Sequence, residues 1–167
     1  MNRARSRRFP VAFVLLALCG ALACTPSPEG DGGPVSDVEP VFPADFAEQY
    51  TETRDCRGSH EHELRFIRVV VDDAALPIYQ TFEGLYPPGA TVVKLEYEDE
   101  GCQRLVGYTA MLRLEEGMYP EGRDWHWQKL DSERRVLEDG APIRCIDCHE
   151  FHCAPPNGHY LTCAEEL

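Results

Sequence analysis

The chain has 167 residues and a formal net charge of −13, with 29 acidic residues against 16 lysines and arginines. Phosphate binding needs a basic footprint, so this balance excludes nucleic acid as an expected partner. The length allows one domain with a modest hydrophobic core.

The first 23 residues have the form of a signal peptide. They contain four arginines and no acid, followed by an apolar run over 11–23 that ends in small residues. This run is shorter than the roughly 20 apolar residues that a bilayer-spanning helix needs. We therefore expect residues 1–23 to be removed. The mature chain, with 12 basic residues against 29 acids and a formal charge of −17, should lie outside the cytoplasm.

Cys24 is the expected first residue of the mature chain. Residues 20–24 resemble a bacterial lipobox, which would place a lipid on Cys24 and attach the protein to a membrane. An ordinary signal-peptidase site after Ala23 gives the same first residue without the lipid. Residues 25–43 are rich in Pro, Gly, Ser and acids, as in a flexible tether. The predicted organisation is a signal peptide over 1–23, a lipidated Cys24 with a tether over 24–43, and one periplasmic or outer-membrane-anchored domain over 44–167.

The predicted elements of that domain are mostly strands. In chain order the pattern predicts a helix over 44–53, a strand over 64–72, a helix over 74–82, and strands over 91–98, 104–114, 125–130 and 135–138. Asp72 or Asp73 can cap the second helix, and Pro77 fits only in its first turn. The fold class is mainly β, an antiparallel sheet with one or two short helices, with α+β as the alternative.

Alternation assigns side chains to the two faces of the predicted sheet. In the strand over 91–98, Val93, Leu95 and Tyr97 share one face. The other face of that strand carries Val92, Lys94 and Glu96.

The eight cysteines divide into groups with different expected fates. Cys19 leaves with the signal peptide and Cys24 is the lipid site, while two more belong to the motif described below. The four that remain in an oxidising compartment predict two disulfides. We expect Cys56 with Cys102 and Cys153 with Cys163, although spacing alone leaves the other two pairings open.

Residues 145–149 carry the chemistry, because Cys145, Cys148 and His149 form a Cys-x-x-Cys-His motif. Two cysteines three residues apart share one face of a helical turn, so both can form thioethers to one porphyrin edge. The adjacent histidine can then ligate the iron. The motif predicts one covalent haem c at a C-terminal attachment turn.

Two other interpretations of these cysteines remain. They could form a further disulfide, or they could join His149, His152 and Cys153 in a zinc site. Zinc sites usually draw two ligand pairs from separated segments, whereas these candidates lie within nine residues.

The position of the motif differs from that of an ordinary cytochrome c, which carries its haem motif near the start of the domain. Only 18 residues follow His149, and none is methionine. An open sixth position on the iron is the expected arrangement. Any protein ligand there would come from the remaining Met and His residues, which are Met111, Met118, His60, His62, His126, His152 and His159.

From about residue 58 to 162 the chain resembles the cytochrome P-460 family, which includes the beta-type cytochromes c-prime. The matching stretches are residues 64–72, 86–94, 107–111, 122–127 and the haem motif. The resemblance implies a mostly β homodimer with a five-coordinate haem c. It also implies either hydroxylamine oxidation or binding of nitric oxide and related diatomic ligands.

The resemblance implies roles for individual residues. Lys94 matches a lysine that can bond covalently to the porphyrin, and Arg68 matches an arginine of the distal pocket. A solvated strand position is the alternative for each. Catalytic members also hold a carboxylate near the iron, for which Glu115 and Glu116 are the nearest candidates in sequence.

Four functions therefore remain open. The chain could oxidise hydroxylamine, or bind a diatomic ligand without turnover. It could also carry electrons to a redox partner protein, or be a disulfide-linked lipoprotein without haem.

Overall fold

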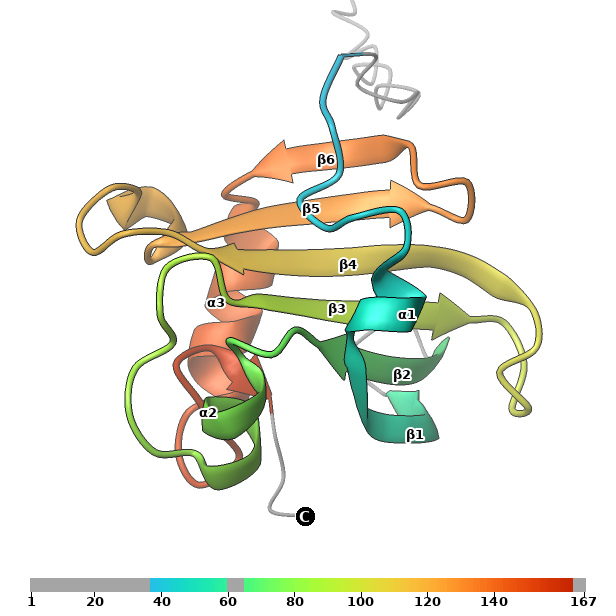
Figure 1. Ribbon diagram of the computed structural model, residues 1–167, viewed down its shortest axis with the longest axis horizontal. Helices are drawn as coiled ribbons and strands as arrows, with labels where there is room; N and C mark the ends of the chain where they lie inside the picture. The colour runs from blue at the N-terminus through green and yellow to red at the C-terminus, as the bar shows by residue number, and fades with distance from the viewer. Residues whose placement is uncertain (1–36, 60–64, 164–167) are drawn as a thin grey trace, which may run out of the picture. The chain divides into compact units, whose positions relative to one another are not determined.

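The computed structural model describes residues 37–59 and 65–163, all within one compact unit. Its centre is a six-stranded antiparallel sheet in which the strands lie in chain order (Figure 1). The strands are β1 (Thr51–Ser59), β2 (Arg65–Val71), β3 (Thr91–Tyr97), β4 (Leu105–Arg113), β5 (Trp125–Asp131) and β6 (Val136–Gly140). The predicted signal peptide and the lipid site at Cys24 lie outside the described residues.

Short helices and a small second sheet complete the fold. They are α1 (Phe46–Gln49), α2 (Leu76–Thr81), the 3-10 turn η1 (Pro120–Gly122), α3 (Ile143–His152), and the pair β7 (Gly158–His159) and β8 (Thr162–Cys163). The prediction of a mainly β fold is confirmed, with three short α-helices where one or two were expected. No helix in the described part of the chain is long and apolar enough to cross a membrane.

Helix α2 begins at Leu76, two residues later than predicted, and its N-cap residue is Ala75, whose side chain makes no capping hydrogen bond. The Asp72 carboxylate accepts a hydrogen bond from the backbone N–H of Ala75 at 2.8 Å, in the turn that precedes the helix. Pro77 lies in the first turn, where its missing N–H costs no hydrogen bond.

The helix expected over 44–53 is mostly wrong. Only Phe46–Gln49 is helical, and the chain enters edge strand β1 at Thr51. Strand β1 pairs with β2 from Thr51 opposite Val71 to Ser59 opposite Arg65. Because this pairing depends on contacts with β2, the local propensity of residues 44–53 does not indicate it.

The two sheet faces bury different clusters. The cavity face packs against α2 and α3 and includes Ile67, Val69, Val92, Met111, Trp125 and Trp127. The far face is covered by the segment before β1 and includes Phe42, Phe46, Val70, Val93, Tyr108 and Leu130. The predicted division of β3, with Val92 and Val93 on opposite faces, is confirmed.

The packed domain begins before residue 44, so the predicted tether over 24–43 is too long. Phe42 is only 2% exposed, and its ring lies 4.7 Å from the guanidinium of Arg134. The side-chain amide of Gln128 donates to the carbonyl of Glu39 at 3.0 Å and accepts from the N–H of Val41 at 2.8 Å. These contacts hold the segment before α1 on the far face.

Two disulfides are present, and both predicted pairings are confirmed. The Cys56–Cys102 bond links β1 to the loop between β3 and β4, and the Cys153–Cys163 bond links the end of α3 to β8.

Replacing Cys153 and Cys163 with alanine should lower the free energy of unfolding by about 2–3 kcal/mol, because the bond closes a short loop and restricts the unfolded chain. Urea unfolding of the oxidised proteins measures this loss, with the Cys56–Cys102 bond intact in both. A variant as stable as the oxidised wild type would show that the bond does not support the end of α3.

Candidate functional site

The motif side chains lie together on α3. Cys145, Cys148, His149 and His152 follow the helical spacing that gathers residues on one face, and all four line the same cavity. Ile146 lies on the same helix, is 2% exposed and joins the core of the cavity face. Burial of Ile146 therefore anchors α3 on the sheet.

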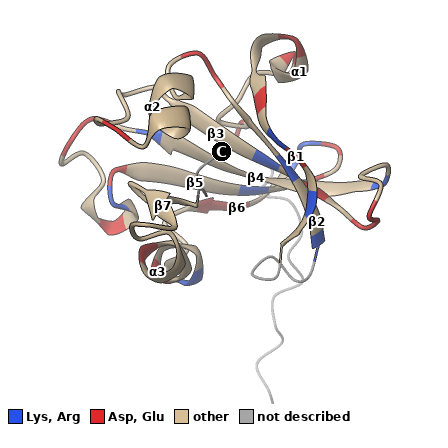
Figure 2. Ribbon diagram, turned by 90° about the horizontal axis from the view of Figure 1, so that it is seen from below, with Lys and Arg blue, Asp and Glu red and all other residues tan. Residues whose placement is uncertain are grey.

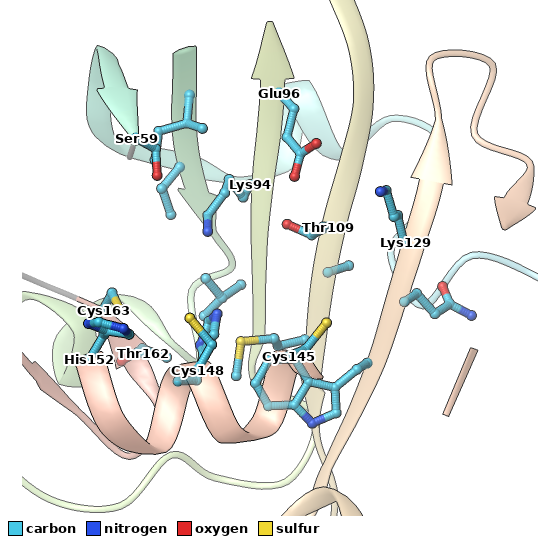
Figure 3. Close-up of a pocket in the computed structure, with 18 of the residues that line it drawn as sticks. Ser59, Lys94, Glu96, Thr109, Lys129, Cys145, Cys148, His152, Thr162 and Cys163 are labelled. Carbon is cyan, nitrogen blue, oxygen red and sulfur yellow. The ribbon is translucent and has the colours of Figure 1, made fainter. Parts of the chain in front are cut away.

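The cavity lies between α3 and the cavity face and has a volume of about 500 Å³. Figure 3 shows Lys94 extending from β3 toward α3, where Cys145 and Cys148 lie across the cavity. Trp127, Met111 and Val92 supply apolar wall. Its size falls within the range of about 300–1,000 Å³ that is usual for cofactor and ligand pockets.

His149 is held in the form that can ligate a metal. Its Nδ1 atom lies 2.5 Å from the carbonyl oxygen of Leu161. A carbonyl only accepts, so Nδ1 carries the proton and the Nε2 atom of the neutral ring keeps its lone pair. The ring of Trp127 packs edge-on at 4.9 Å between ring centroids and fixes the imidazole plane.

Burial, helped by the positive charge of Lys94, lowers the pKa of His149 from 6.5 to about 4. The ring is therefore neutral at pH 7, as iron ligation requires. Burial also raises the pKa of the Cys145 thiol. Neither Cys145 nor Cys148 is in a disulfide.

Acid should destabilise the haem-free protein through His149. Between pH 6.5 and 4 the unfolded chain binds a proton at this histidine that the folded chain does not bind. The free energy of unfolding is thus highest above pH 6.5 and falls by up to about 3 kcal/mol as the pH drops to 4. Urea unfolding at pH 7 and pH 4.5 measures the difference. His149→Gln should reduce the pH dependence of the free energy of unfolding, whereas His126→Gln should leave it as in the wild type. If His149→Gln and the wild type had the same pH dependence, His149 would not be its cause.

Lys94 lines the cavity. Arg68 does not. Arg68 belongs to the far face of β2, where its Nη1 atom lies 3.3 Å from the Glu52 carboxylate and its Nη2 atom 3.7 Å from that of Asp55. The structure therefore does not bring Arg68 together with Lys94 and His149.

Two cavity residues were missed at the sequence level. Arg54 of β1 lines the cavity and is only 6% exposed. Glu96 of β3 is also 6% exposed, with an oxygen 3.9 Å from the Nε atom of Arg65. The sequence signal for Glu96 was the alternation of the strand, which places Glu96 on the same face as Lys94.

Glu115 and Glu116, the carboxylates nearest in sequence to the expected site, do not line this cavity. They line a separate hollow together with Pro87 and Tyr160. Glu96 is the only acid lining the main cavity among residues 37–59 and 65–163.

The candidate sixth ligands are dispersed. Met111 and His152 line the cavity, whereas Met118 is 70% exposed. His126 lies 2.8 Å from an Asp139 oxygen, and the Nε2 atom of His159 lies 2.7 Å from the carbonyl of Gly84. His60 and His62 lie outside the described residues.

The residues present fit a haem c. Two unbonded thiols and a neutral histidine lie on one helix face beside a cavity of suitable size. In residues 37–59 and 65–163, no three His, Cys, Asp or Glu side chains are grouped to hold a metal ion. A haem iron needs only one proximal protein ligand, because the porphyrin supplies its in-plane ligands.

No family model matches the chain, and no curated protein matches it.

Proposed function

We propose that the chain is an exported c-type haem protein that binds small nitrogenous or diatomic ligands at an open iron site. The observation that carries this proposal is that Cys145, Cys148 and His149 line the same cavity. Each thiol would add across one vinyl group of the porphyrin, so attachment loses no atoms. Lipid on Cys24 would hold the domain at a membrane.

The bound haem would supply an iron that takes a small ligand and exchanges electrons. The chain's residues do the rest. His149 would hold the iron from α3, and Trp127 with the Leu161 carbonyl fixes the orientation of its ring. Lys94 extends from β3 into the same cavity, where it would bond to the porphyrin or place a positive charge beside it.

Ligand binding has a direct optical test. The ferrous protein, matured in a host that attaches haem c, should bind carbon monoxide at one molecule per haem with a large Soret change. A six-coordinate ferrous spectrum that carbon monoxide leaves unaltered would refute the open site.

A second function, hydroxylamine oxidation, is favoured by one observation: the buried Glu96 on the cavity wall. Conversion of hydroxylamine to nitric oxide releases three protons and three electrons. A carboxylate shielded from water can accept protons, while a one-electron acceptor protein would take the electrons in turn. This proposal therefore includes a redox partner protein, and it takes the chain to act as a homodimer.

Glu96→Gln should lower kcat for hydroxylamine oxidation by roughly 10²–10⁴-fold, the usual contribution of a general base. Carbon monoxide binding should be unaltered, because the iron site remains open. Glu115→Gln is the matched control, since Glu115 does not line the cavity. Equal turnover by Glu96→Gln and the wild type would show that Glu96 is not the proton acceptor. If the wild type does not oxidise hydroxylamine at all, ligand binding remains as the proposed function.

A further inference from the structure

The cavity concentrates positive charge in an acidic domain. Of the 12 lysines and arginines in residues 37–59 and 65–163, five line it, namely Arg54, Arg57, Lys94, Lys129 and Arg144. Glu96 is the only one of the 23 acids in the same part of the chain that does so. Figure 2 shows blue segments along β1 and across the sheet, with much of the red in loops. This asymmetry points to an occupant that carries negative charge.

Arg54 and Arg57 reach the cavity through an irregularity in β1. Residues three apart on a regular strand point to opposite faces. Here the register shifts, so that Arg54 pairs with Val69 and Arg57 pairs with Ile67. Ile67 and Val69 are two apart on β2 and both line the cavity. The bulge therefore turns two guanidinium groups to the same face, a known way of re-aiming side chains beside a site.

The bulge is fixed on both sides. Cys56, between the two arginines, is bonded to Cys102. Asp55 points the other way and lies 3.7 Å from Arg68 on the far face. Behind Arg54, the ring of Tyr79 lies 5.9 Å from the guanidinium carbon and limits its movement.

We infer that Arg54 and Arg57 bind the two propionate carboxylates of the haem, an assignment that rests on the proposed function. The propionates lie on the half of the porphyrin opposite the vinyl groups that Cys145 and Cys148 would take. Strand β1 and α3 are separate walls of the cavity, so one macrocycle can meet the thiols on α3 and the arginines on β1. A guanidinium fork matches carboxylate geometry and binds it in two places.

Porphyrin binding to the haem-free full chain tests this inference. Quenching of tryptophan fluorescence and the change in the Soret band report binding of ferric protoporphyrin IX and of its dimethyl ester. The ester keeps the iron and ring but loses both negative charges. The wild type should bind the acid at least tenfold more tightly than the ester, and Arg54→Gln with Arg57→Gln should abolish that preference.

The matched control removes two arginines elsewhere. Arg104 and Arg135 are exposed, pair with Glu98 and Asp131, and do not line the cavity. Arg104→Gln with Arg135→Gln should keep the acid preference. Equal affinity of the wild type for acid and ester, or a preference that survives Arg54→Gln with Arg57→Gln, would overturn the inference.

A second readout uses the matured protein. Removing two cations beside the haem favours the more positive ferric state, so Arg54→Gln with Arg57→Gln should shift the midpoint reduction potential downward, and the control pair should not. An unchanged potential would contradict the assignment. A matured protein with no haem at all would refute the proposed function and this inference together, whereas haem with no acid preference refutes only the inference.

Discussion

Replacing both Cys145 and Cys148 with serine should abolish covalent haem in protein matured by a host that attaches haem c, whereas the wild type should carry one haem per chain. The expectation follows from the free state of both thiols and their place on one helix face beside the cavity. Serine keeps the size of the side chain but cannot form a thioether. Peroxidase staining of denatured protein on a gel detects only attached haem and so measures this loss.

The matched control removes the same number of cysteines from another place. Cys56 and Cys102 form the disulfide beside the β1 bulge and do not line the cavity. Cys56→Ser with Cys102→Ser should keep its haem stain. Stain that persists without Cys145 and Cys148 would place attachment elsewhere in the chain.

Trp125→Ala should lower the free energy of unfolding by about 3–5 kcal/mol, a large share of the 5–15 kcal/mol typical of a domain. Trp125 is fully buried on the cavity face, where its ring lies 5.2 Å from that of Tyr86. The guanidinium of Arg113 lies 5.6 Å from the same ring. Truncation would leave a cavity that the surrounding strands cannot close.

Leu85→Ala is the control for this truncation, because Leu85 is 61% exposed and buries little surface. Its urea unfolding midpoint should stay close to that of the wild type, while that of Trp125→Ala falls. A fall of less than about 1 kcal/mol for Trp125→Ala would mean that β5 is not packed as described.

Much of the sheet was predictable because its signals are local. Strands β3, β4 and β5 alternate along their length, so the faces of Val92, Val93 and Lys94 follow from a period of two. The number of disulfides followed from an oxidising compartment and the removal of four cysteines with other expected roles, whereas spacing alone left the choice of pairs open. The Cys-x-x-Cys-His motif on α3 was also predictable from local sequence, because its spacing is that of a single helical turn.

The rest depends on how neighbouring strands pair. The two arginines of β1 reach the cavity only because a register shift against β2 breaks the alternation. The family resemblance instead made Arg68 the candidate, yet Arg68 lies on the far face beside Glu52. Glu96 was predicted to share a face with Lys94. Its burial, however, depends on packing by the neighbouring strands and by α3, which a local sequence pattern does not predict.

The pyridine haemochrome assay on full-length wild-type protein, matured in a host that attaches haem c, tests the central claim most directly. It reports both the amount of haem and the saturation of its vinyl groups. The proposed function predicts one haem per chain with the spectrum of two thioether bonds, from Cys145 and Cys148. Protein that folds with both disulfides formed and yields no haemochrome would contradict it.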